Sequence, residues 1–447
     1  GGGAEQQRWT QITRYDDRIV AATFGEGCLY LVSRKDAPRG KVLRAAVEMG
    51  RMMPASEIIP QHSKWSIHTS FFETTGVTPA AGALYVEYMA GGPSYVQVFD
   101  AKGGAIESAR AFWGNPTQPS TALNEIVDAG DHVLLCREGF LEPAEWFSHK
   151  PGDSAVTLTG LKETSPARLE GLVTERAWVT SKDGTQVPIT ILRRADAPKD
   201  GTVPTILWGY GGYGVSETPK FSPRRALWLE QGGTFAVANI RGGGEFGDEW
   251  HRAGNLTNKQ NVFDDFAAAA RYLIDQRYTS REKLALMGGS NGGLLMGATF
   301  TQNPDLCKAV VSSVGIYDML RVERSANGAF NITEFGTVAD SEQFRALHAY
   351  SPYHHVKDGM RYPAILMPTG ANDPRVDPMQ SRKMIARLQA ADPDGLFLLR
   401  TSANAGHGIG SSLAQRIEEY TDVYGFLFTQ LGLAFKPVGV GGQQPVK

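Results

Sequence analysis

The sequence predicts a chain of two parts, in which an α/β domain follows an all-β domain. Short strand-like runs, separated by turn signals and without any long helical pattern, fill residues 8 to about 165. From about residue 170 onwards, strand-like runs alternate with helical stretches, which is typical of a parallel sheet covered by helices on both faces. Within this second part, a glycine-rich turn at 288–293 joins a short apolar run to a helical stretch.

The composition is that of a globular protein. The chain has 447 residues, of which 42% are hydrophobic and 21% charged, and its net charge is -2; this length allows two or more domains. No basic stripe indicates a nucleic-acid partner, and no apolar run is long enough to span a membrane. Cys28, Cys136 and Cys307 lie far apart, which fits neither a metal site nor a disulfide framework. We therefore expect no metal and no cofactor.

The first residues give little information about the compartment. The chain opens with three glycines and has no initial methionine, so a missing signal peptide carries little weight. We expect a soluble protein, either cytoplasmic or periplasmic.

Residues 1–169 are expected to form the all-β domain. Its strand-like runs are rich in β-branched and aromatic residues and lie at 19–24, 28–32, 83–89, 95–99 and 132–136. Strand pairs recur every few tens of residues, and a propeller blade takes about 40–50 residues. The spacing therefore favours three or four blades of a β-propeller over the alternative, a β-sandwich.

Residues 170–435 are expected to form the α/β domain, and the tail at 436–447 is expected to be disordered. A hairpin is predicted at 175–181 and 187–192. Further strands are predicted at 205–208, 234–239, 284–287, 309–313, 364–367 and 396–399, and helices at 263–278, 291–302, 378–391 and 413–431. Alternation of this kind places the loops that carry chemistry at the carboxyl ends of the strands.

The glycine-rich turn contains Gly288-x-Ser290-x-Gly292, the spacing of a nucleophile elbow. A serine at the apex of a sharp turn from strand to helix has an exposed hydroxyl, and its neighbours must be small because strand and helix come close. The amino end of the following helix offers free N–H groups to a developing oxyanion. The alternative is a glycine-rich turn with an incidental serine. The strand before it and the helix after it favour a catalytic Ser290.

A serine nucleophile needs a histidine as base and a carboxylate that orients the histidine, and in α/β-hydrolases the chain order is serine, acid, histidine. Among the histidines after Ser290, His407 follows the last predicted strand between two glycines, whereas His354 and His355 are expected in a surface loop. Asp373 follows the strand at 364–367 and is the predicted acid; Asp377 is the alternative. Either aspartate could instead be a turn residue beside proline.

The oxyanion hole is expected to use the backbone N–H of Asn291 and a donor from the loop after the strand at 205–208. That loop reads Gly209-Tyr-Gly-Gly-Tyr-Gly214, and Tyr210 is the candidate donor. The same letters fit a dinucleotide-binding fingerprint, which requires a helix directly after the glycines. Prolines follow at 219 and 223 without a helical period before them, so we reject a nucleotide site.

These motifs together resemble those of the prolyl oligopeptidase family of serine peptidases. The resemblance covers residues 170–435 and includes the motifs at 209–213, 239–251, 288–293, 372–376 and 406–408. It implies an α/β-hydrolase domain with a seven-bladed β-propeller cap that admits only short peptides. It also implies the triad of Ser290, Asp373 and His407, the oxyanion hole of Tyr210 and Asn291, and Arg375 as the residue that binds a substrate carbonyl.

The chain departs from the family pattern in two places. About 165 residues before the hydrolase domain are too few for seven blades, and the family's segment before the propeller is absent. We therefore expect a fragment, or a partner that supplies a missing N-terminal part of the same protein. The family's proline pocket contains a stacking tryptophan, and Asn331 stands at that position. Tyr213, Ile316, Phe335 and Val376 would still line an apolar pocket, so the preference for proline is expected to be weak.

Three functions remain open from the sequence. The leading hypothesis is a serine oligopeptidase whose substrates are short peptides. An esterase of the same fold would need the same triad, although esterases usually carry helical lids rather than a β-rich cap. A non-catalytic binding module is disfavoured by the intact serine, aspartate and histidine.

Overall fold

The structure is a computed structural model that describes residues 11–69, 75–106, 121–408 and 411–437. The chain divides into two compact units. One comprises Gly1–Glu163 with Gly214–Lys220 and Gly244–His251, and the other Thr164–Tyr213, Phe221–Gly243 and Arg252–Lys447. Two short segments from within the α/β part of the sequence therefore group with the first unit. Among the described residues, no helix is long and apolar enough to cross a membrane. Most of the tail that was expected to be disordered lies outside the described residues.

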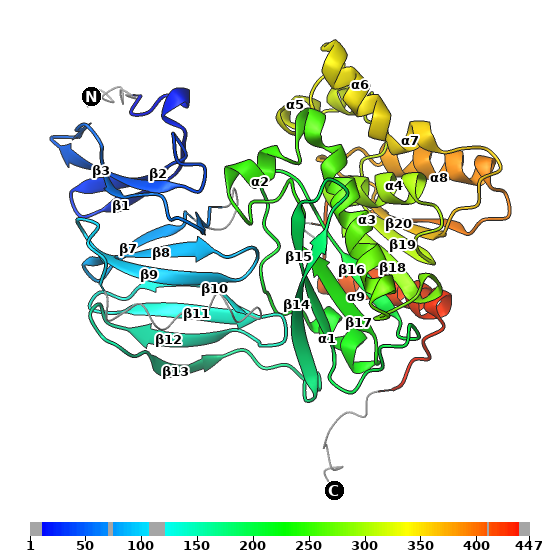
Figure 1. Ribbon diagram of the computed structural model, residues 1–447, viewed down its shortest axis with the longest axis horizontal. Coiled ribbons are helices and arrows are strands. Elements are labelled where there is room, and N and C mark those ends of the chain that lie inside the picture. Colours follow the sequence, from blue (N-terminus) through cyan, green and yellow to red (C-terminus); the bar gives the residue numbers. More distant parts are fainter. Residues whose placement is uncertain (1–10, 70–74, 107–120, 409–410, 438–447) are drawn as a thin grey trace, which may run out of the picture. The chain divides into compact units, whose positions relative to one another are not determined.

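The described residues of the first unit form three antiparallel sheets (Figure 1). The first contains β1 (Ile19–Gly25), β2 (Cys28–Ser33), β3 (Lys41–Glu48), β4 (Arg51–Met52) and β5 (Ser56–Ile59). The second contains β6 (Ser66–Ile67), β7 (Val77–Ala80), β8 (Ala83–Met89) and β9 (Ser94–Asp100). The third contains β10 (Thr121–Asp128), β11 (Val133–Gly139), β12 (Glu145–His149) and β13 (Thr157–Lys162).

Strand β8 explains how these sheets pack. Side chains alternate between the two faces of a strand, yet every residue of β8 is buried. Leu84, Val86 and Tyr88 belong to a core shared with the first sheet, whereas Ala83 and Tyr85 belong to a core shared with the third. The second sheet is therefore packed on both faces, as in neighbouring blades of a propeller-like domain and unlike a sheet of a two-layer sandwich.

The second unit is built on one sheet of eight strands in the order β14-β15-β17-β16-β18-β19-β20-β21. The strands are β14 (Leu172–Thr180), β15 (Gln186–Arg194), β16 (Thr205–Trp208), β17 (Thr234–Ala238), β18 (Leu284–Gly289), β19 (Ala309–Ser313), β20 (Ala364–Gly370) and β21 (Phe397–Ser402). All pairs from β17 to β21 are parallel, but β14–β15 and β15–β17 are antiparallel. The expected parallel sheet is thus mixed, because the tight turn between β14 and β15 forces that pair to be antiparallel.

In the part of the chain that the structure describes, the α-helices are α1 (Pro223–Glu230), α2 (Asp248–Arg252), α3 (Gln260–Asp275), α4 (Asn291–Gln302), α5 (Gly328–Phe335), α6 (Ser341–Tyr350), α7 (Pro352–His355), α8 (Met379–Ala391) and α9 (Leu413–Leu431). Helix α4 packs against β18 and β19 (Figure 1) and is buried almost throughout. The expectation of a surface loop at His354 and His355 is wrong. Both lie in α7, where Pro352 occupies the first turn and its fixed φ favours a helical start.

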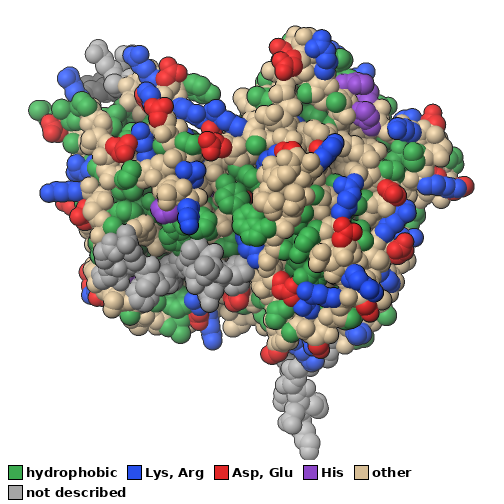
Figure 2. Space-filling model, in the orientation of Figure 1, with side chains coloured by type: hydrophobic (Ala, Val, Ile, Leu, Met, Phe, Trp, Pro, Cys, Tyr) green, Lys and Arg blue, Asp and Glu red, His purple; other side chains and the backbone are tan. Residues whose placement is uncertain are grey.

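Charged side chains of both signs are interspersed over the face shown in Figure 2. This distribution matches the near balance of 45 basic and 47 acidic residues in the chain. A surface of this kind creates no extended field of one sign on that face.

Candidate active site

Ser290 stands between the end of β18 and the start of α4. Its backbone has φ 59° and ψ -117°, a conformation that residues with a side chain rarely adopt. The Ser290 amide donates to the Ser313 carbonyl at 2.8 Å, which fixes the turn against β19. A Cβ atom on Gly292 would lie 2.8 Å from the Gly209 carbonyl oxygen, and one on Gly288 would lie 2.6 Å from the Gly292 oxygen. The glycines of this motif are therefore required by close approach of the backbone.

His407 and Asp373 form a hydrogen-bonded pair. The distance between His407 Nδ1 and Asp373 Oδ2 is 2.6 Å, and the two side chains are 8% and 0% exposed. Because an ionised carboxylate can only accept a hydrogen bond, Nδ1 carries the proton in this contact. Nε2 is then the ring nitrogen that retains a lone pair and can accept a proton from a hydroxyl.

Asp373 is also held by the turn that follows it. Its Oδ1 accepts the amides of Arg375 and Val376, each at 2.9 Å. Burial would raise the pKa of this carboxyl, but the hydrogen bonds from His407, Val376 and Arg375 outweigh burial and hold the pKa below its ordinary value. The alternative acid, Asp377, is exposed and accepts the Met379 amide. The geometry favours Asp373 as the partner of the histidine.

Ser290, Asp373 and His407 lie on loops at one edge of the sheet. Ser290 directly follows β18, Asp373 follows β20 and His407 follows β21. Neighbouring strands from β18 to β21 are parallel, so their carboxyl ends meet at the same edge.

The loop after β16 lies against the elbow. The Asn291 Nδ2 atom donates to the Tyr210 carbonyl at 2.6 Å. A Cβ on Gly292 would lie 3.6 Å from the Cδ2 atom of the Tyr210 ring, which places this ring beside the turn that carries the serine. Asn291 is the first residue of α4, and the first amides of a helix have no carbonyl partner within it. The first helix after this loop, α1, starts only at Pro223, so no helix opens directly behind the glycines.

Four of the predicted specificity residues line a small cavity, whereas Tyr213 and Phe335 are not part of its lining. Ile316, Asn331, Arg375 and Val376 line it, and the structure adds four residues to this lining: Val322, Ser325, Asp377 and Gln380. Tyr213 contacts this lining through its hydroxyl, which donates to Asn331 Oδ1 at 2.8 Å. Its ring stacks on Phe330 and meets Phe335 edge to face, with both pairs of ring centroids 5.7 Å apart.

Asn331 is therefore a buried polar group with a partner rather than a lone amide in an apolar wall. Asn331 is only 5% exposed, and Phe335 is fully buried. Asn331 and Phe335 both come from α5, a helix that the sequence pattern did not predict.

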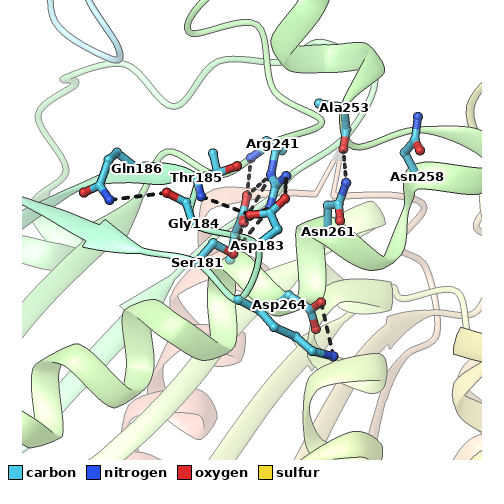
Figure 3. A network of polar contacts seen from close by, with 12 residues as sticks. Ser181, Asp183, Gly184, Thr185, Gln186, Arg241, Ala253, Asn258, Asn261 and Asp264 are labelled. Carbon is cyan, nitrogen blue, oxygen red and sulfur yellow. Dashed lines mark hydrogen bonds and ion pairs between the residues drawn. The ribbon is translucent and has the colours of Figure 1, made fainter.

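Arg241 lies in the loop after β17, and its contacts hold this loop where the Tyr210 loop packs against it. Figure 3 shows its guanidinium reaching Ser181 and Asp183 in the turn between β14 and β15. Its Nε atom also donates to Asp265 Oδ2 on α3 at 2.9 Å. The adjacent Gly242 approaches so closely that a Cβ there would lie 2.6 Å from the Gly211 oxygen. Arg241 thus anchors the loop that packs against the candidate oxyanion loop.

Lys259 and Glu334 form a second buried charge pair near the site. Lys259 Nζ lies 2.7 Å from Glu334 Oε1, and the side chains are 1% and 2% exposed. The same ammonium donates to the Gly211 carbonyl at 3.0 Å. Sequence reasoning gave no role to Arg241, Lys259 or Glu334, because the charged partners are separated along the chain and no motif marks a buried lysine.

A mixed sheet of this strand order, a strained serine before a buried helix and an aspartate–histidine pair at the same edge define the α/β-hydrolase class. Residues 219–434 match the model of the prolyl oligopeptidase family. The chain belongs to the prolyl oligopeptidase family.

Individual relatives agree with this assignment. The prolyl endopeptidase of Elizabethkingia meningoseptica is 35% identical over 434 residues, which cover 94% of this chain and 58% of the relative. A chain from a structural and mechanistic analysis of two prolyl endopeptidases is 38% identical, with a TM-score of 0.84 over 92% of this chain and 59% of that one.

Prolyl oligopeptidase B of Galerina marginata, bound to a 25mer macrocyclization substrate, is 28% identical, with a TM-score of 0.83 over 93% of this chain and 57% of that one. The present chain thus spans less than two thirds of the length of these relatives.

Proposed function

We propose that this chain is a serine peptidase that hydrolyses short peptides through an acyl-enzyme intermediate. The observation that carries the proposal is the contact of 2.6 Å between His407 Nδ1 and the buried Asp373 carboxylate, at the sheet edge where Ser290 directly follows β18. This pairing leaves His407 Nε2 as the base that a serine hydroxyl requires. Domain limits of 1–169 and 170–435 remain part of this proposal.

In the proposed reaction, Ser290 Oγ attacks the peptide carbonyl while His407 Nε2 takes its proton. The Asn291 amide and the Tyr210 hydroxyl stabilise the negative charge that develops on the carbonyl oxygen. His407 then gives the proton to the leaving amine, and water hydrolyses the acyl-enzyme by the same route. The Asp373 carboxylate keeps the imidazole in the required tautomer and stabilises its protonated form.

The residues around Asn331 are proposed to receive the P1 side chain. Ile316, Phe335 and Val376 supply apolar walls, and Arg375 is proposed to bind a substrate carbonyl. The Tyr213–Asn331 hydrogen bond supports a pocket that takes small apolar residues, proline and alanine included, without the strict preference that a stacking tryptophan would give. When an apolar ligand binds, polar atoms that already form a hydrogen bond with each other cost less to bury than an unpaired amide would.

The decisive experiment is to incubate the purified chain with a library of short peptides and to read the products by mass spectrometry, with Ser290→Ala as the matched control. We expect cleavage by the wild type alone, and labelling by a fluorophosphonate probe at Ser290. Hydrolysis of acyl esters without any peptide cleavage would favour an esterase instead. If neither substrate is cleaved and the probe labels nothing, the catalytic proposal is wrong.

A further inference from the structure

The ammonium of Lys259 contacts two different parts of the site. It donates to the carbonyl of Gly211, which lies directly after Tyr210, and it pairs with Glu334, which lies directly before Phe335. The Nζ atom also lies 5.3 Å from the centre of the Phe335 ring. One side chain thus connects the loop of the proposed oxyanion donor to the helix that forms the wall of the proposed P1 pocket.

Two further hydrogen bonds join the loop at 210–213 to other elements. The Tyr210 carbonyl accepts Asn291 Nδ2, from the residue after the proposed nucleophile. The Tyr213 hydroxyl donates to Asn331 on α5. The hydrogen bonds through Lys259 and Tyr213 both lead to α5.

Burying a lysine and a glutamate is costly, and well-packed apolar residues often stabilise a fold equally well. An apolar pair, however, cannot donate a hydrogen bond to the Gly211 carbonyl. An ammonium has three donors on one atom, so it can bridge a carboxylate and a carbonyl from different elements. The charge pair therefore supplies a hydrogen bond to the Gly211 carbonyl, which apolar packing could not supply.

We propose that Lys259 is a positioning residue: with Glu334, it fixes the Tyr210 loop relative to α5, so that the oxyanion donor and the P1 wall keep one mutual geometry. This inference rests on the proposed function, because it deepens the role of the same site. Lys259 is assigned no contact with substrate and acts through the Gly211 carbonyl.

The test uses a charge-neutral pair of substitutions, Lys259→Met together with Glu334→Gln, because replacing one partner alone would leave a buried charge. Lys283→Met is the matched control: Lys283 Nζ also donates to a backbone carbonyl, that of Leu431, at 2.7 Å. It precedes β18, at the opposite end of the strand from Ser290. Thermal unfolding establishes that each variant is folded.

We expect the neutral pair to lower kcat for a short peptide by about 10²-fold, the scale of a displacement of about 1 Å in an active site, with a smaller change in KM. The Lys283→Met control should retain the activity of the wild type. In a Tyr210→Phe background the same pair should lower kcat by no more than about threefold, because the donor that it positions is already gone. Equal losses in both backgrounds, or an unchanged kcat in a folded variant, would overturn the inference.

Hydrogen–deuterium exchange gives a readout that does not depend on turnover. We expect the amides at 209–213 to exchange at least about tenfold faster in the neutral pair, with β18 unchanged, since the loop loses its link to α5 through Lys259 and keeps only the one through Tyr213. Unchanged exchange at 209–213 overturns the positioning role. If the wild type cleaves nothing but exchange still rises in this loop, the proposed function fails while the mechanical link between loop and helix stands.

Discussion

The hydrogen bond between Tyr213 and Asn331 should contribute to the free energy of unfolding, because Asn331 is buried. The Tyr213 hydroxyl donates to Asn331 Oδ1 at 2.8 Å, and Asn331 is 5% exposed. Burial and the nearby Glu334 carboxylate raise the pKa of Tyr213, so its hydroxyl remains a donor at neutral pH. Tyr213→Phe removes the donor and leaves a buried acceptor without this partner.

The expected magnitude follows from that burial. An unsatisfied buried acceptor costs about 1–3 kcal/mol, whereas removal of both partners together can be nearly neutral. We expect Tyr213→Phe and Asn331→Val each to lower the free energy of unfolding by about 1–3 kcal/mol. The double variant should lose less than the sum, with a coupling energy of about 1 kcal/mol.

Urea denaturation of the four proteins, followed by tryptophan fluorescence, measures this cycle. The same four proteins should be compared by kcat/KM for peptides that differ only in P1. The apolar double variant should favour proline and alanine more strongly over serine than the wild type does, because a polar pair has left the pocket. Strictly additive losses of stability would refute the view that the two side chains hold each other in place.

Four further substitutions have expected outcomes. Ser290→Ala should abolish peptide cleavage with little change in thermal stability; more than trace activity in a clean preparation would exclude Ser290 as the nucleophile. Tyr210→Phe should lower kcat by about 10²–10³-fold, the cost of one oxyanion donor, and an unchanged kcat would make this tyrosine structural. Asn331→Trp should raise the proline-to-alanine ratio of kcat/KM by up to about tenfold, the scale of an aromatic stack; a wild-type ratio already above about a hundredfold would contradict the assignment of this position. Asp373→Asn should lower kcat by about 10⁴-fold. Because the fold lowers the pKa of Asp373, its ionised form stabilises the protein above the ordinary pKa, so the deficit of the variant in urea should shrink as the pH falls below about 4.

Local patterns predicted the centre of the second unit well. The bounds of α4, Asn291–Gln302, and of α9, Leu413–Leu431, agree with the apolar periodicity of these stretches. The pairing of Asp373 with His407 follows from the positions of both residues after neighbouring strands. In such cases the local sequence and the final packing favour the same structure.

Other features depend on contacts that no local pattern encodes. Helices α5, α6 and α7 were not predicted, since each has only 4 to 10 residues and packing rather than periodicity decides whether so short a segment is helical. Lys259 and Glu334 are 75 positions apart, and Arg241 and Asp265 are 24 apart. From the sequence alone a lysine is expected to be exposed, and only the fold shows that a carboxylate pairs with it in the interior.

The backbone of Ser290 has a consequence for how this chain can change over generations. An L-residue held at a positive φ with a ψ of -117° stores about 1–3 kcal/mol of strain, and glycine alone would release most of it. Replacement of the proposed nucleophile, Ser290, by glycine is therefore expected to end turnover and to stabilise the folded state. Without selection for peptide cleavage, this substitution would be favoured by the gain in stability, and the resulting protein would still bind but no longer react.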